Sequence, residues 1–175
     1  RSAGATHAAG RRIGGVAAIE LGHVRTHRHR GSGRAAQVEA ERAGADGVII
    51  DCMGDPGLYA ARELVRIPVV GPAQASMHLA AILGYRFSVL CIFDQDIPMF
   101  EDQSARYGLS TKLDSVRAIN IPVLDLRTDL EATMEALINT GEHAVREDGA
   151  HVIVPGCTGL AGLAPRIRSD LAERG

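Results

Sequence analysis

A stretch of fifteen residues occurs twice in this chain, and the repeat limits the folds that the chain can adopt. GADGVIIDCMGDPGL at residues 44–58 and GAHVIVPGCTGLAGL at residues 149–163 align at a constant offset of 105. Each copy has a short apolar, β-branched run, typical of a buried strand, and then a cysteine and a glycine-containing turn. The repeat therefore predicts two similar strand–turn–helix units. The identical pairs are Gly44/Gly149, Ala45/Ala150, Cys52/Cys157, Gly54/Gly159, Gly57/Gly162 and Leu58/Leu163.

Segments typical of strands and of helices alternate along the rest of the chain. Helix stops at Gly44 and Gly84 and an expected helix cap at Asp55 before Pro56 support the assignment. A further cap is expected at Thr128 or Asp129. We expect strands over 46–52, 67–73, 86–93, 115–126 and 151–157, and helices over 35–45, 56–66, 74–84, 97–108, 129–149 and 162–175.

This alternation predicts an α/β protein with two pseudo-symmetric lobes, each built on a parallel, doubly wound sheet. We expect a first lobe over residues 35–84 that carries Cys52 and a second lobe over residues 85–175 that carries Cys157. Ligands of open parallel sheets bind beyond the carboxyl ends of the strands, so the site is expected in the cleft between the lobes.

Residues 1–34 differ from the remainder in charge and pattern. They hold seven arginines and one glutamate, whereas the remainder is acidic and the whole chain has a net charge of −2. We expect an atypical, largely irregular segment here, although GGVAAIELG at 14–22 is compatible with a short strand. His27 and His29 lack partners at zinc-ligand spacing, and no aromatic residues alternate with the basic ones, so we expect neither a metal site nor nucleic-acid binding.

Composition narrows the protein class further. Hydrophobic residues make up 46% of the chain and aromatic residues 3%, so the core is built from aliphatic side chains. No apolar run approaches the roughly 18 residues that a membrane-spanning helix needs, so we expect no membrane partner. Three cysteines, an odd number without a legible secretory signal, indicate reduced thiols in the cytoplasm. Because the chain begins with Arg1 rather than Met, a fragment or a processed form is expected.

The paired cysteines suggest proton transfer at carbon. A helix start presents backbone N–H groups that can lower a thiol pKa or hold a substrate oxygen. One thiolate could remove a proton from one face of a carbon while the other thiol returns a proton to the opposite face. The alternative for a single cysteine is a small buried core residue. That alternative is favoured for Cys91, which has no glycine turn after it.

Other residues bear on the mechanism. Lys112 is the only lysine of the chain, and no phosphate-binding glycine loop accompanies it, which argues against a pyridoxal-phosphate Schiff base. Asp55, beside Cys52, could influence which thiol starts ionised. Ser76 opens the helix after a predicted strand, where it either caps that helix or lines the pocket.

The stretch DCMGDPGLYAARELVRIPVVGPAQASMHLAAILGYRFSVL, together with VPGCTGLAGLA, resembles the aspartate/glutamate/hydantoin racemase superfamily, and most of all its hydantoin and allantoin racemases. The resemblance covers about residues 38–174. It implies cofactor-independent racemisation of a small molecule, a cyclic ureide, with Cys52 and Cys157 as catalytic acid and base. It also implies a homo-oligomer. By position in the motifs it implies substrate binding by Met53, Gly54, Thr158 and Gly159. We also expect Ser76 to bind substrate, if it lines the pocket rather than caps its helix.

The chain departs from this family at both ends. Residues 1–34 lack the Asn–Pro–Asn–Thr–Ser-like loop that follows the family's first strand, and the family continues past its last shared helix, so we expect a truncated C-terminus. Three alternatives stay open: an aspartate or glutamate racemase, a maleate-isomerase-like enzyme that uses one cysteine as nucleophile, and an inactive truncated member. Met53, Gly54 and Leu160 stand where the amino-acid racemases have polar residues, which weakens the first of these.

Overall fold

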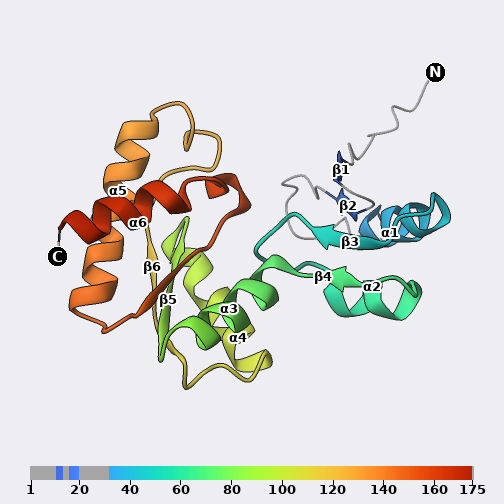
Figure 1. Ribbon diagram of the computed structural model, residues 1–175, viewed down its shortest axis with the longest axis horizontal. Helices are drawn as coiled ribbons and strands as arrows, with labels where there is room; N and C mark the ends of the chain where they lie inside the picture. The colour runs from blue at the N-terminus through green and yellow to red at the C-terminus, as the bar shows by residue number, and fades with distance from the viewer. Residues whose placement is uncertain (1–10, 14–15, 20–31, 175) are drawn as a thin grey trace. The chain divides into compact units, whose positions relative to one another are not determined.

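The computed structural model describes residues 11–13, 16–19 and 32–174 (Figure 1). The chain divides into two compact units, residues 1–72 and 73–175. The helix expected over residues 74–84 was predicted to belong to the first lobe, whereas it groups with the second unit in the structure. The His78 ring of this helix lies 6.3 Å, between ring centroids, from the ring of Tyr107 in that unit.

The first unit is built on a four-stranded sheet. The strand order is β1-β2-β3-β4, in which β1 is antiparallel to β2 and the other neighbours are parallel. The segment expected to be irregular thus contains two strands, and the strand expected within residues 14–22 is confirmed as β2. The elements are β1 (Arg11–Ile13), β2 (Val16–Ile19), α1 (Ser32–Arg42), β3 (Gly47–Ile50), α2 (Leu58–Leu64) and β4 (Val69–Val70). The interpretation of His27 and His29 lies outside the described residues.

An aliphatic core holds this unit together. β3 buries Val48 and Ile50, while Ile49 between them is 38% exposed, because successive side chains of a strand point to opposite faces. Helices α1 and α2 contact each other and the sheet. The buried core consists of Val48, Ile50, Leu58, Ala61, Val65 and Val69.

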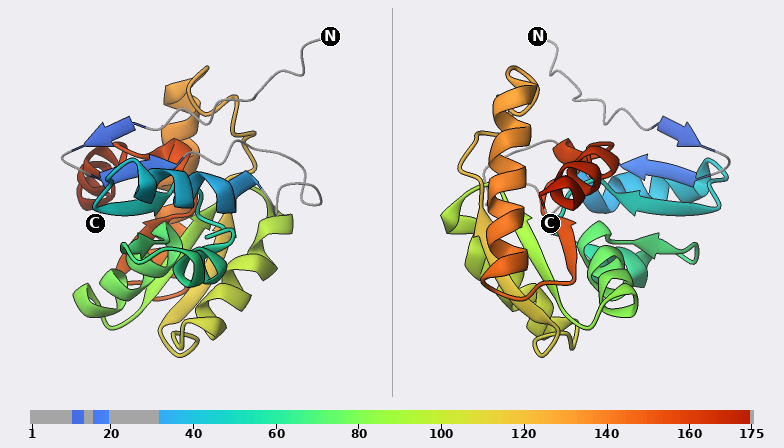
Figure 2. Two further views of the ribbon diagram at one scale, coloured as in Figure 1. Left: turned by 90° about the vertical axis from the view of Figure 1, so that its right-hand side faces the viewer. Right: turned by 60° about the vertical axis from the view of Figure 1, so that its left-hand side comes forward.

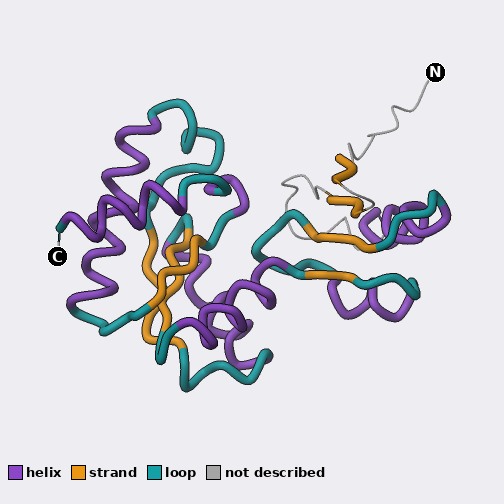
Figure 3. The backbone as a smooth tube through the Cα atoms, in the orientation of Figure 1, coloured by secondary structure: helices purple, strands orange, loops and turns teal. Residues whose placement is uncertain are grey.

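The second unit is a parallel α/β layer structure, as predicted. Its three-stranded sheet has the order β6-β5-β7 with all neighbours parallel, and strands alternate with helices along the chain (Figure 3). The elements are α3 (Pro72–Leu83), β5 (Phe87–Cys91), the 3-10 turn η1 (Asp94–Asp96), α4 (Ile97–Arg106), β6 (Leu113–Ala118), α5 (Leu130–Arg146), β7 (Val152–Pro155), the 3-10 turn η2 (Thr158–Leu160) and α6 (Ala164–Glu173).

Helices cover both faces of this sheet. All five residues of the central strand β5 are buried, which requires cover on each side. Helices α5 and α6 pack together on one face, and α4 lies on the other (Figures 1 and 2). This is the doubly wound arrangement that right-handed crossovers produce.

The N-terminal ends of α5 and α2 can be compared with the predicted helix caps. Asp129 caps α5 as expected, since its Oδ1 accepts the N–H of Ala132 at 3.0 Å. The cap expected at Asp55 is wrong: α2 begins at Leu58, and its N-cap is Gly57 at φ 72°. Asp55 and Gly57 both have left-handed backbones, so the chain turns at both residues and the helix begins only after Gly57.

Candidate functional site

The two copies of the sequence repeat form turns with the same backbone hydrogen bonds. Strands β3 and β7 both end two residues before their cysteine. The N–H of the third residue after each cysteine donates to the cysteine carbonyl, from Asp55 to Cys52 at 3.0 Å and from Leu160 to Cys157 at 3.0 Å. The next bond is also repeated, at 3.2 Å from Leu58 to Asp55 and at 3.1 Å from Leu163 to Leu160. The repeat in the sequence is therefore a repeat in structure, with one half-buried cysteine in each unit.

Each thiol interacts with the glycine two residues later. The N–H of Gly159 donates to the Sγ of Cys157 at 3.3 Å, and the backbone of Gly54 makes the corresponding bond to Cys52. The second bond lowers the Cys52 pKa, as expected for a turn N–H. Burial raises this pKa by more, and the carboxylates of Asp55 and Asp51 raise it further, so the net shift is upward.

Cys91 has a different environment from the paired cysteines. It is fully buried at the end of β5, and its Sγ donates to the carbonyl of Phe93 at 3.4 Å. Burial and the nearby carboxylate of Asp96 raise its pKa to about 11. The side chain therefore remains a neutral thiol at physiological pH, which fits a core residue.

The residues expected to bind substrate fall into two groups, one in each unit. Met53 and Gly54 lie in the turn after Cys52, where Met53 is buried. Thr158 and Gly159 belong to η2, directly after Cys157, and are half-buried.

The fifth expected residue, Ser76, lies inside a helix rather than at its start. Helix α3 begins at Pro72, so the prediction that Ser76 caps it is wrong. The Ser76 hydroxyl instead donates to the carbonyl of Ala73 at 3.3 Å, a bond to the preceding turn that serine often makes within helices. Ser76 is half-buried, and its role as a pocket residue stays a prediction.

Asp55 occupies an unusual position beside Cys52. It is 7% exposed and has a left-handed backbone, with φ 45°. Its carboxylate lies against the backbone of Gly71 at the end of β4: a Cβ added at Gly71 would lie 2.5 Å from Asp55 Cγ. Glycine at position 71 therefore makes room for a carboxylate that sequence reasoning had assigned to a helix cap.

Arg127 is a residue that sequence reasoning missed. Its Nη2 donates to the carbonyls of Gly159 and Ala161, each at 3.3 Å, and so places a guanidinium on the Cys157 turn. These contacts join residues 32 and 34 positions apart, and no local pattern in the sequence points to them. By contrast, the equivalence of positions 55 and 160, occupied by Asp55 and Leu160, follows directly from the repeat at its offset of 105.

Neither a metal site nor a membrane span is found among the residues that the structure describes. No group of three or more His, Cys, Asp or Glu side chains is placed to hold a metal ion there. None of the described helices is long and apolar enough to cross a membrane.

Lys112 has a structural role at the surface. Its ammonium group donates to the carbonyl of Tyr85 at 3.2 Å and lies 4.5 Å from the centroid of the Tyr85 ring.

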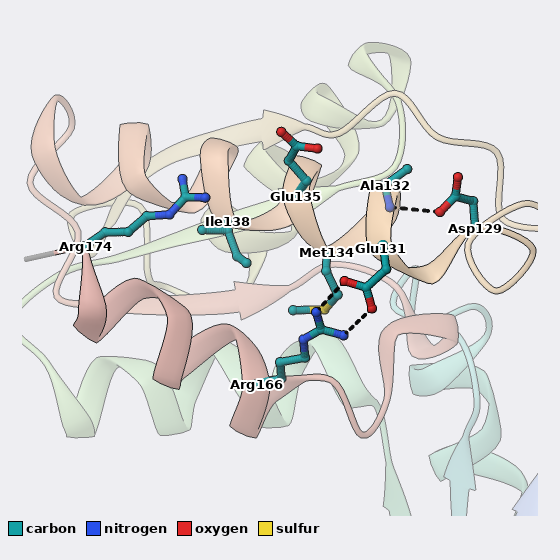
Figure 4. A pocket seen from close by; sticks show the side chains of 8 residues that line it. All are labelled: Asp129, Glu131, Ala132, Met134, Glu135, Ile138, Arg166 and Arg174. Carbon is teal, nitrogen blue, oxygen red and sulfur yellow. Dashed lines mark hydrogen bonds and ion pairs between the residues drawn. The ribbon is translucent and has the colours of Figure 1, made fainter.

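A hollow on the surface of the second unit lies between α5 and α6 and contains neither cysteine (Figure 4). Arg166 and Glu131 form a two-bond ion pair across it, at 2.9 and 2.7 Å. Because the hollow contains neither cysteine, we assign it no part in catalysis. The lining residues are Asp129, Glu131, Ala132, Met134, Glu135, Ile138, Arg166 and Arg174.

Comparison with known proteins identifies the family. The family model described as Asp/Glu/Hydantoin racemase matches residues 23–174. The chain belongs to this family. It is 41% identical to the hydantoin racemase of Pseudomonas sp. (strain NS671) over 133 residues, which are 76% of this chain and 53% of the relative. It is 39% identical to the hydantoin racemase of Rhizobium meliloti over 130 residues, 74% of this chain and 54% of that protein.

Solved structures support the same family. Allantoin racemase from Klebsiella pneumoniae matches with a TM-score of 0.76 at 33% identity, over 79% of this chain and 57% of that one. Glutamate racemase RacE1 from Bacillus anthracis matches with a TM-score of 0.57 at 16% identity, over 89% of this chain and 63% of that one, and shares the fold. The chain spans about half the length of the curated relatives that it matches.

Proposed function

We propose that this chain is a racemase without a cofactor, in which Cys52 and Cys157 exchange protons with a cyclic ureide such as a 5-substituted hydantoin or allantoin. The observation that carries the proposal is the repeated turn, with each thiol two residues past a parallel strand and bonded to a glycine of its own turn. Family membership adds support, because relatives in this family are named racemases, which are isomerases.

The proposed reaction moves one proton off carbon and another on. A thiolate takes the proton from ring carbon C5, and the electron pair passes into the neighbouring carbonyl as an enolate. The thiol on the opposite face then gives its proton to C5, so the stereocentre inverts and the first cysteine ends as the thiol. The ring proton is more acidic than the α-proton of an amino acid, which is why two thiols suffice.

The turns supply the remaining groups. Gly159 and Leu160 donate their N–H groups to Cys157, so we propose that the N–H of Thr158 serves the developing enolate oxygen, because such a donor stabilises negative charge that forms in the transition state. We propose that Gly54, Thr158 and Gly159 contact the ring through their turns, and that Met53 and Ser76 shape the space around its substituent. The chemistry needs reduced thiols, so we further propose a reducing compartment such as the cytoplasm, and we expect a homo-oligomer.

Cysteine variants test this proposal. Purified wild-type chain and the variants Cys52→Ala, Cys157→Ala and Cys91→Ala are each incubated with one enantiomer of a 5-substituted hydantoin, and optical rotation is followed over time. We expect loss of racemisation in the first two variants and retention in Cys91→Ala, the matched control whose thiol is buried in β5. Full racemisation by both Cys52→Ala and Cys157→Ala would refute the two-thiol mechanism.

A further inference from the structure

The two cysteine turns share their backbone hydrogen bonds but differ in the buried side chain of the third residue after the cysteine. The residue that donates its N–H to the cysteine carbonyl is Asp55 in the first turn and Leu160 in the second. Both are buried, with exposed fractions of 7% and 1%. A carboxylate therefore occupies, beside Cys52, the place that an aliphatic group occupies beside Cys157.

The structure fixes the Asp55 carboxylate in place. Its backbone is left-handed, a conformation that aspartate and asparagine tolerate better than most residues. The carboxylate rests on the backbone of Gly71, where any larger residue would meet it. The charge consequently stays close to Cys52.

The electrostatic surroundings of Cys52 favour the neutral thiol. Burial is the largest cause of its raised pKa, and Asp55 is the larger of the two carboxylate contributions, ahead of Asp51. The Gly54 N–H lowers this pKa by more than either carboxylate raises it, but by less than burial does, so the net shift stays upward. Cys52 packs against the aliphatic core that β3, α2 and β4 form, which is the source of its burial.

The Cys157 turn carries the opposite charge. Arg127 holds its guanidinium on this turn through two backbone carbonyls, and the Gly159 N–H points at the sulfur. Positive charge and N–H donors near a sulfur favour the thiolate. The carboxylate of the first turn has no counterpart here, because Leu160 fills its position.

We propose that Asp55 is a positioning residue for racemisation: together with the burial of the thiol, its carboxylate favours the protonated Cys52 in the resting protein, while Arg127 favours Cys157 as the thiol that ionises first. This inference rests on the proposed function. The resting protein then holds its base on Cys157 and its acid on Cys52, and it reacts first with the enantiomer whose C5 proton faces Cys157. After one turnover the protons are reversed, and exchange with water restores the resting state.

Alkylation of the two thiols tests the inference without any need for turnover. Protein at a series of pH values is treated briefly with limiting iodoacetamide, and mass spectrometry of peptides measures the rate at each cysteine separately. We expect the Cys157 rate to reach its midpoint at a lower pH than the Cys52 rate. Asp55→Asn should lower the Cys52 midpoint and leave Cys157 unchanged. Arg127→Gln should raise the Cys157 midpoint and leave Cys52 unchanged.

Two further variants keep the test decisive. Asp55→Gly adopts the left-handed backbone readily and should reproduce the shift of Asp55→Asn, so a poorly folded asparagine variant does not remove the test. Glu63→Gln removes an exposed carboxylate of α2 and should shift neither midpoint. A Cys52 midpoint that stays unchanged in folded Asp55→Asn and Asp55→Gly would overturn the inference, as would a wild type in which Cys52 ionises first. The expected shifts in a folded protein that racemises nothing would support the charge assignment and contradict the proposed function.

Discussion

Gly156 precedes Cys157 and is pressed against the central strand, so its replacement gives a sharp prediction. The Gly156 N–H donates to the carbonyl of Leu90 at 2.7 Å. A Cβ on Gly156 would lie 2.8 Å from that carbonyl oxygen and 3.0 Å from Val89 Cγ1. Alanine must therefore move the end of β7 away from β5. Overpacking of this kind costs about 1–3 kcal/mol, and a weakened hydrogen bond adds about 1 kcal/mol.

We expect Gly156→Ala to lose about 2–4 kcal/mol of unfolding free energy in urea, measured by circular dichroism, and to change the alkylation rate of Cys157. Gly108→Ala is the matched control. Gly108 has φ 75° and open space where its Cβ would stand, so alanine there costs about 1–2 kcal/mol of backbone strain and leaves Cys157 unchanged. A Gly156→Ala protein as stable as wild type, with unchanged Cys157 reactivity, would refute the close approach of β7 to β5.

Three further predictions concern stability. Asp129→Ala removes the cap of α5 and should cost about 1 kcal/mol in urea unfolding; no loss would contradict the cap. Leu137→Ala opens a cavity in the fully buried core under α5 and should cost about 2–5 kcal/mol, whereas a cost below about 1 kcal/mol would contradict that packing. Hydrogen bonds from Arg117 lower the pKa of Asp148 in the folded state below its ordinary value of 3.8. The ion pair therefore stabilises the fold fully above that value and loses its effect as the pH falls through the lower folded-state pKa. Asp148→Asn should thus be less stable than wild type at neutral pH, with a difference that shrinks in acid; a difference independent of pH would contradict this.

Local patterns in the sequence predicted much of the fold. The apolar run before each cysteine gave β3 and β7, and the two strands end at equivalent positions of the repeat. The cap of α5 followed from the preference of Asp129 for the residue before a helix. Both kinds of signal succeed because the determining contacts lie within a few residues.

The features that escaped prediction depend on distant contacts or on competing local preferences. Aspartate is a common helix cap, but Asp55 has a left-handed backbone and its carboxylate lies against Gly71, so Gly57 precedes the helix instead. The fit of Asp55 against Gly71 joins two separate turns, and Arg127 reaches the Cys157 turn across more than thirty residues. The proposed difference in ionisation between the two cysteines depends on these contacts, which no periodicity encodes.

The central claim is that this chain inverts a ureide stereocentre through two thiols. The most direct measurement is proton NMR in D2O of the purified chain with single enantiomers of 5-substituted hydantoins and of allantoin, with optical rotation recorded in parallel. The account predicts that the C5 proton signal disappears as the rotation decays, because each inversion leaves a deuteron from solvent on the carbon. A folded chain that exchanges no C5 proton in any of these substrates, or that loses the signal while the rotation stays constant, would contradict it.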